Sequence, residues 1–300
     1  MSILQALQQN FPPFVVDIVR LSLWLLLLMV IFVPLERLFA VTPQKVFRKS
    51  WFTDLGYFFL NGLVTKAALV LPMAVIAWGL HRVVPGAVHA AVGGLSLGTR
   101  LVLALVAGEI GFYWGHRWTH EVPFLWRFHS IHHSAPEVDW LVNNRAHPVD
   151  IVFVRLCGFV PMYALGLAQP LVGTHIDVVP MLVLIIGTTW GYVIHANLRW
   201  RFGPLEWLVS TPHFHHWHHT KNDHVNKNYA SMLPVMDLLF GSAYLPKKQW
   251  PADYGIDGHM SHGFVGQLLQ PFMLEADQPQ VPEVAVEAAS AAEASTADRT

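Results

Sequence analysis

Residues 211–229, TPHFHHWHHTKNDHVNKNY, carry six histidines within twelve positions. No packing argument for a core or a surface requires imidazole at that density, so the first interpretation is a metal site. His215, His218 and His219 are spaced i, i+3, i+4. On an α-helix these offsets place the three side chains on one face, about 5–6 Å apart at Cβ. The stretch therefore predicts a helix that can bind a metal from one side.

Two clusters upstream have helical offsets of the same kind. His116 and His120 are spaced i, i+4, and His129, His132 and His133 are spaced i, i+3, i+4. The three clusters together hold eight histidines, about twice the four ligands that a tetrahedral zinc ion takes. We therefore expect two metal ions rather than one. Imidazole suits Zn, Cu, Fe and Ni, so the ligand type alone does not choose the metal.

The composition indicates the environment of this site. The chain has 300 residues, is 53% hydrophobic and only 13% charged, and has a mean hydropathy of +0.39. Soluble domains are roughly one quarter charged, so these values predict a multi-pass membrane protein. A net charge of −1 gives no reason to expect a nucleic-acid partner. A single cysteine, Cys157, permits no intramolecular disulfide.

Apolar runs of membrane-spanning character occupy residues 14–34, 54–80, 101–114, 151–171 and 178–194. We expect a kink at Pro72 in the second run. A short link around Gly173 joins the last two runs, which predicts a hairpin that enters the membrane and returns. The predicted fold class is all-α: a multi-pass membrane bundle of about four to five membrane-embedded helices, with a cytoplasmic-facing helical cap that carries the histidines.

Positive charges suggest the orientation. The connection at residues 36–49 is net basic, so the positive-inside tendency places it in the cytoplasm. By the order of the runs, the histidine clusters lie on this same side, and so do His147 and His195. We therefore expect a multi-pass integral membrane protein whose active site faces the cytoplasm, in the inner or plasma membrane if the protein is bacterial.

Four residues along the third run and just after it fall at steps of four, three and four: Glu109, Tyr113, His116 and His120. They form one stripe along a helix. Glu109 and Tyr113 are therefore candidate catalytic residues. A carboxylate at this position can orient a ligating imidazole or move protons. The alternative is that Glu109 pairs with Lys66 or Arg155 and only neutralises buried charge.

Two enzyme classes lack their motifs. His120 and Glu121 are followed by Val, Pro and Phe, so the H-E-x-x-H signature of metalloproteases is missing. The Glu-x-x-His pairs of carboxylate di-iron bundles are also missing. A different class remains as the alternative: a histidine-rich transporter of Zn or another divalent metal, or a metal-binding membrane protein without oxidase activity. A transporter should carry polar ligands near the bilayer midplane, whereas these clusters lie at or beyond the ends of the runs.

HRWTH (116–120), HSIHH (129–133) and HFHHWHH (213–219) resemble the three histidine boxes of the fatty acid hydroxylase and sterol desaturase superfamily, which are integral-membrane di-iron oxidases. The flanking sequences resemble that family too, namely Arg145-x-His147-Pro148, His195-Ala196-Asn197, Thr211-Pro212, Asn228-Tyr229 and Asp237-x-x-Phe240-Gly241. The resemblance runs from about Glu109 to Tyr244. Ala230 stands where the family often has Gly, and Glu109 where Asp is common; neither change removes a ligand.

The resemblance implies two Fe ions and a set of ligands made up of His116, His120, His129, His132, His133, His147, His195, His215, His218 and His219. His213, His216 and His224 rank below these. O₂ would be the co-substrate, and an apolar molecule such as a sterol, fatty acyl chain, ether lipid or carotenoid would be hydroxylated or desaturated. We favour hydroxylation over desaturation, although both begin with the same hydrogen abstraction.

The chain contains no nucleotide-binding glycine motif and no cysteine set for haem or iron–sulfur. Electrons from NAD(P)H should therefore arrive through a separate ferredoxin- or cytochrome-type carrier. Four cations would offer it a basic landing area, or serve only as positive-inside charge: Arg117, Arg127, Lys221 and Lys227.

The expected organisation has three parts. Residues 1–100 form N-terminal transmembrane helices, and residues 101–250 form the catalytic domain that the resemblance implies. Residues 251–300 form a C-terminal extension, and its low-complexity sequence predicts disorder from about residue 275.

Overall fold

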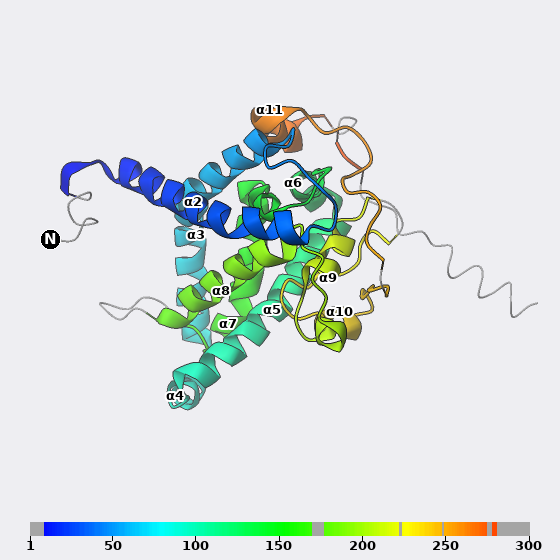
Figure 1. Cartoon of the computed structure of the whole chain (residues 1–300). Helices are drawn as coiled ribbons and strands as arrows, with labels where there is room; N and C mark the ends of the chain where they lie inside the picture. The colour runs from blue at the N-terminus through cyan, green and yellow to red at the C-terminus, as the bar shows by residue number, and fades with distance from the viewer. Residues whose placement is uncertain (1–8, 170–176, 222–223, 248, 275–277, 281–300) are drawn as a thin grey trace, which may run out of the picture.

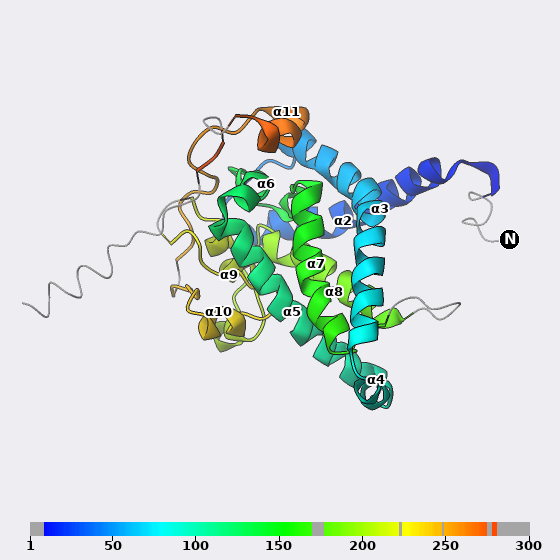
Figure 2. The same cartoon turned by 180° about the vertical axis from the view of Figure 1, so that it is seen from behind.

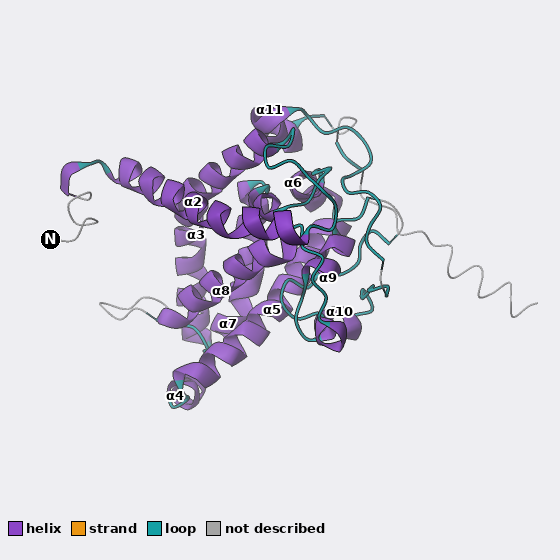
Figure 3. Cartoon of the chain, viewed as in Figure 1, coloured by secondary structure: helices purple, strands orange, loops and turns teal. Residues whose placement is uncertain are grey.

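A computed structural model describes residues 9–169, 177–221, 224–247, 249–274 and 278–280, apart from the side chain of Lys66. Every regular element within these residues is helical (Figures 1 and 3). The α-helices are α2 (Pro13–Phe39), α3 (Trp51–Val83), α4 (Gly86–Gly93), α5 (Leu97–Glu121), α6 (Pro123–His133), α7 (Pro148–Ala164), α8 (Val178–His195), α9 (Pro212–His218), α10 (Val235–Leu239) and α11 (Gly263–Leu269). Short 3-10 helices are η1 (Trp140–Asn144), η2 (Gly203–Trp207) and η3 (Gln270–Phe272). The predicted all-α membrane bundle is confirmed.

Within the part of the chain that the structure describes, three helices are long and apolar enough to cross a membrane, namely α2, α5 and α8. A fourth span results if the two halves of α3, Trp51–Thr65 and Ala67–Val83, are counted together across their 41° bend. The bend lies upstream of Pro72, where the sequence predicts a kink. Proline has no N–H for the carbonyl four residues before it, and its ring crowds that carbonyl, so the helix opens on the N-terminal side of the proline.

Helices α5 and α7 form the most extensive helix contact among the described elements, and Figure 2 shows them side by side. Two glycines of α5 permit the close approach. A Cβ at Gly111 would collide with the carbonyl of Cys157 on α7, and one at Gly115 would lie 2.6 Å from the Cys157 Cβ. Small residues at such crossings bring membrane helices together. The crossing places the N-terminal turn of α7 beside the histidines of α5.

A buried network of four charges connects α3 to the segment that contains η1. Arg48 binds both oxygens of Asp139 at 2.7 Å and one oxygen of Asp54 at 2.6 Å. Arg145 donates to the other Asp54 oxygen at 3.0 Å. Arg48 belongs to the connection that is net basic in sequence, and in the structure it is only 4% exposed. Its charge is used to hold the 139–145 segment in place.

The C-terminal helices cover the cytoplasmic end predicted for the bundle. Helix α11 packs on α3, and η3 packs on α6, where Phe272 contacts the rings of Phe128 and His147. Residues 275–277 and 281–300, where the sequence predicts disorder, lie outside the described residues.

Candidate metal centre

Nine buried histidines converge in two groups, each of which could hold a metal ion. The first group is His116, His120, His129, His133 and His218, and the second is His132, His195, His215 and His219. Within each group the ligand atoms lie within 4.8 Å of one another. The groups adjoin, because the rings of His133 and His219 stack at 4.5 Å. The structure thus brings together nine of the ten histidines that the resemblance implies.

The second and third histidine boxes each divide between the two groups. His132 and His133 are neighbours on α6, so their side chains point about 100° apart around the helix, and each joins a different group. In the third box, His218 joins the first group, while His215 and His219 join the second. Two ions next to one another would therefore share the same helices.

The second ring nitrogen of most of these histidines is hydrogen-bonded to an oxygen. The Nδ1 of His116 lies 2.6 Å from the Tyr229 carbonyl, and that of His129 lies 3.0 Å from the Asp150 carboxylate. The other Nδ1 atoms contact backbone carbonyls: His132 contacts Arg145 at 3.0 Å, His195 contacts Gly191 at 2.7 Å, and His218 contacts Lys227 at 2.8 Å. An oxygen acceptor at Nδ1 places the proton there. The Nε2 lone pair is then directed toward the group, as in metal-bound histidines.

The Nε2 atoms face one another at distances that suit a shared ion. His116 and His129 are 3.2 Å apart at Nε2, and His132 and His195 are 3.1 Å apart. Since the Nδ1 atoms of all four carry the proton, each pair would oppose two lone pairs. Two nitrogens bound to one ion at about 2.0–2.1 Å lie about 3.0–3.4 Å apart. The Nε2 of His120, buried without a hydrogen-bond partner, leads to the same conclusion. The donor set fits a cation in each group.

Burial also keeps these imidazoles neutral. Outside the spanning helices, desolvation lowers the pKa of His133, His215, His218 and His219 well below the usual value, and neighbouring histidines lower the pKa further. Neutral imidazole is the form that binds metal.

A loop after α9 holds the Tyr229 carbonyl in position. The Asp237 carboxylate accepts hydrogen bonds from the backbone N–H of Tyr229 at 2.7 Å and of Ala230 at 2.8 Å, and from the Ser242 hydroxyl at 2.6 Å. Asn228 donates to the carbonyls of Phe214 and Tyr244. The Asn-Tyr and Asp-x-x-Phe-Gly sequences therefore hold the acceptor of His116.

Every second residue from 224 to 228 in the same loop has a positive φ: His224 at 70°, Asn226 at 60° and Asn228 at 58°. Asparagine tolerates this left-handed conformation better than most residues. Asn226 uses it to present its side-chain oxygen 3.2 Å from the Nδ1 of His120. His224 instead stacks on Tyr244 at 3.6 Å, away from both groups.

His147 lies outside both groups. It caps the N-terminus of α7, where its Nδ1 accepts a hydrogen bond from the N–H of Val149 at 3.1 Å. The lone pair at its Nδ1 thus accepts a backbone hydrogen bond, whereas six of the nine grouped histidines have an oxygen atom beside Nδ1. His216 and His213, ranked lower from sequence, bond the Ala196 and Gln249 carbonyls at 3.1 Å and 2.7 Å.

Glu109 and Tyr113 contact the loop after α9 rather than a grouped imidazole. The Glu109 carboxylate accepts hydrogen bonds from the N–H groups of Met232 at 2.8 Å and Leu233 at 3.2 Å, and from the Ser231 hydroxyl at 3.1 Å. Tyr113 shares a 2.7 Å hydrogen bond with the hydroxyl of Ser242. Both positions therefore anchor the segment whose backbone supports His116.

Asp150 and Asn226 are site residues that sequence reasoning missed. Each binds the Nδ1 of a grouped histidine. Asp150 had a signal, because an acidic residue in the first turn of an apolar membrane helix requires a partner.

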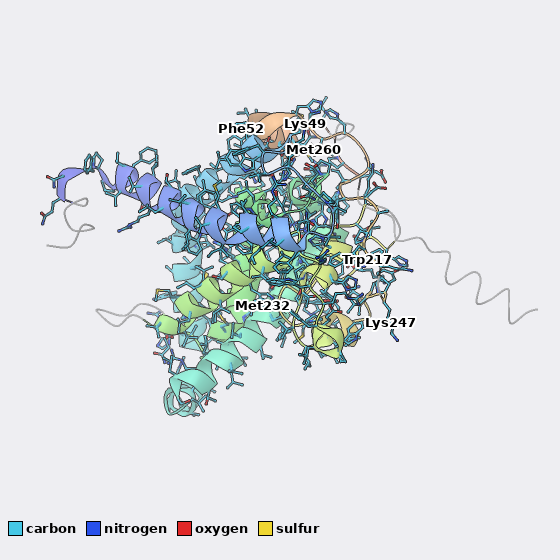
Figure 4. The ribbon with its side chains drawn as sticks, in the orientation of Figure 1. Lys49, Phe52, Trp217, Met232, Lys247 and Met260 are labelled. Atoms are coloured by element: carbon cyan, nitrogen blue, oxygen red, sulfur yellow. The ribbon has the colours of Figure 1, made fainter. Side chains whose placement is uncertain are left out.

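A cavity of about 520 Å³ opens on the histidines. Helices α3, α5, α7 and α8 supply most of its wall, and apolar side chains such as Leu105, Phe159 and Met162 dominate it. Met232 also lines it, and Figure 4 shows this residue among the helices, while Trp217 and Lys247 lie on the loop-rich side. The histidines that line the cavity are His116, His129, His132, His195 and His215. Both groups can thus reach one apolar molecule.

Residues 101–242 match the fatty acid hydroxylase family model. This segment contains all nine grouped histidines. Just under half of the chain is thus similar to this family. The match confirms the resemblance seen in the histidine boxes.

Similar proteins carry names from lipid metabolism. An ornithine lipid hydroxylase of Rhizobium tropici is 39% identical over 58% of this chain and 50% of its own length. An alkylglycerol monooxygenase of Xenopus tropicalis is 30% identical over 49% of this chain and 31% of its own. A very-long-chain aldehyde decarbonylase of Oryza sativa is 27% identical over 48% and 52%. The matched regions thus span about half or less of these curated relatives. No solved structure matched the chain.

Proposed function

We propose that this protein is a membrane-bound non-haem di-iron oxygenase that hydroxylates a lipid-like substrate with O₂ and external electrons. The observation that carries the proposal is the pair of adjoining histidine groups at the end of an apolar cavity. The family and the names of the relatives support it. A zinc transporter is disfavoured, because the grouped ligands lie near the ends of α5 and α8 rather than midway along them.

In this proposal the nine grouped histidines hold two irons, and His147 is not a ligand. Iron held by neutral imidazoles can activate O₂ for attack on an unactivated C–H bond. The chain's own residues orient the ligands through their Nδ1 partners and hold the substrate in the cavity. The apolar wall excludes water that would otherwise quench the reactive species.

Hydroxylation is favoured over desaturation, because two of the relatives above are named a hydroxylase and a monooxygenase. We further propose that the site faces the cytoplasm and that a ferredoxin- or cytochrome-type carrier delivers electrons from NAD(P)H. Of the four cations expected to receive that carrier, Arg117 pairs with Glu121 at 2.8 Å, and Lys221 lies 3.3 Å from Asp257. Exposed pairs of this kind are weak, so an acidic partner can replace the carboxylates.

Two measurements test the proposal. The purified protein should contain two tightly held irons per chain, whereas one exchangeable zinc without iron would support the transporter. Lipid extracts of cells with and without the gene should differ by a product heavier by one oxygen. His132→Ala should abolish that product while the protein remains in the membrane. Full activity in His132→Ala would show that the second group is wrongly assigned.

A further inference from the structure

Arg155 on α7 lines the same apolar cavity as the histidines. The two carboxylates that line this cavity have other partners. Glu109 accepts hydrogen bonds from the Ser231 hydroxyl and from the N–H groups of Met232 and Leu233, and Asp150 binds His129. No ion pair joins Arg155 to a carboxylate of the described residues, and its electrostatic neighbour is the hydroxyl of Tyr192. A guanidinium inside a membrane bundle is costly unless it is paired, so such residues usually serve a function.

The polar groups around Arg155 provide hydrogen-bond donors. The Tyr192 hydroxyl donates to the side-chain oxygen of Asn144 at 3.1 Å, which occupies that acceptor. The side-chain nitrogen of Asn144 is buried and has no hydrogen-bond partner. Asn144 lines the same cavity as Arg155 and Tyr192. A guanidinium and an amide NH₂ with unused hydrogens form a site for an anionic oxygen group.

We propose that Arg155, assisted by Asn144, binds the anionic group of an amphiphilic substrate, a phosphate or a carboxylate, while the apolar wall accepts its hydrocarbon chain. This inference rests on the proposed function, because it narrows the substrate of that same cavity. Neutral molecules such as hydrocarbons and carotenoids would leave the guanidinium without a partner, so they are disfavoured as substrates.

The position of Arg155 also restricts which carbon reacts. Arg155 follows Asp150, the partner of His129, by five residues, a rise of about 7.5 Å along the helix. Tyr192 precedes His195 of the second group by three residues, about 4.5 Å. Both helices therefore place the anion site near the proposed irons. The reacting carbon then lies close to the charged headgroup, not at the far methyl end of the chain.

The test is equilibrium binding to the purified protein in neutral maltoside micelles, with two probes of equal chain length, hexadecyl phosphate and hexadecan-1-ol. A charge-assisted hydrogen bond is worth roughly 1.5–3 kcal/mol, so the wild type should prefer the phosphate about tenfold to hundredfold. Arg155→Gln should lose that preference and still bind the alcohol, and Arg155→Lys should keep part of it. Arg20→Gln is the control, because Arg20 is an exposed membrane-helix cation paired with Asp17.

Equal binding of the two probes by the wild type would overturn the inference, and so would an undiminished preference in Arg155→Gln. An equal loss in Arg20→Gln would mean that the preference comes from general membrane charge. Displacement of hexadecyl phosphate by millimolar inorganic phosphate would show a site for the free ion rather than for a lipid. If Arg155→Gln does not fold, the wild-type comparison and Arg155→Lys decide. Binding needs no turnover, so a preference for phosphate without any oxidised product would count against the proposed function alone.

Discussion

At the scale of single residues, the site depends on partners that are far from the histidines in sequence. Asp150 lies 21 positions after His129 and still supplies its Nδ1 acceptor. His116 depends on a carbonyl 113 positions away, at Tyr229. Helical offsets reveal which imidazoles share a face, but they contain no information on what binds the second nitrogen. The two acceptors that are side chains, Asp150 and Asn226, are therefore targets for mutations that leave the ligand itself intact.

Asp150→Asn should weaken the first group without removing a ligand. The amide can still accept a hydrogen bond from His129, but it lacks the charge that orients the imidazole and raises its basicity. Changes to such partners typically cost about 10–100-fold in metal affinity or activity. Iron titration of the purified variant measures the loss, with Glu121→Gln, an exposed surface carboxylate, as the control. Unchanged affinity would mean that the charge of Asp150 does not support metal binding through His129.

His147→Asn should retain both irons, because the structure uses His147 as the N-cap of α7 and not in either group. Asparagine is a strong N-cap, so helix stability should change by less than about 1 kcal/mol. His132→Asn is the matched comparison and should lose iron from the second group. Elemental analysis of both purified variants gives the answer. Loss of an ion in His147→Asn would restore His147 to the ligand set.

At the scale of helices, sequence predicted the class and the general course of the bundle because apolar length and histidine periodicity are local properties. It predicted the long helices α2, α5 and α8 correctly, since membrane spans need continuous apolar residues. It missed the burial of Arg48, because a basic residue in a loop has the same sequence signal whether it faces lipid headgroups or two aspartates. It also missed how α6 and α9 divide between the two groups, since that depends on helix packing.

Asp54→Asn tests the network that fixes the segment before α7. The variant leaves Arg48 and Arg145 buried with one carboxylate fewer, and breaking a buried pair typically costs about 3–5 kcal/mol. Thermal unfolding in detergent should therefore show a clear loss of stability. The second iron should also bind more weakly, because the Arg145 carbonyl accepts the hydrogen bond of His132. Asp17→Asn removes an exposed pair with Arg20 and should change stability by no more than about 0.5 kcal/mol. Equal melting curves for the two variants would show that the network contributes no net stability.

At the scale of the whole molecule, the nine histidines come from α5, α6, α8 and α9 and from the C-cap of α9. Metal binding by such dispersed ligands would stabilise the packing of these helices against one another, because the unfolded chain offers no preformed site. The same arrangement places the two histidine groups at one end of the bundle. Helix α4 lies at the opposite end of α5 (Figure 1), and Leu97 and His116 are about 28 Å apart along the axis.

The two ends should therefore lie on opposite faces of the membrane, and under the proposed orientation the histidine end should face the cytoplasm. Single cysteines at Ala90 in α4 and at Lys247 in the loop beyond α10, both exposed, would report on this in a Cys157→Ser background. A membrane-impermeant maleimide should label Ala90→Cys in intact bacterial cells, and it should label Lys247→Cys only in inverted vesicles. The opposite result would reverse the orientation and require an electron donor outside the cytoplasm. Labelling of both sites from one face would mean that α5 does not cross the bilayer.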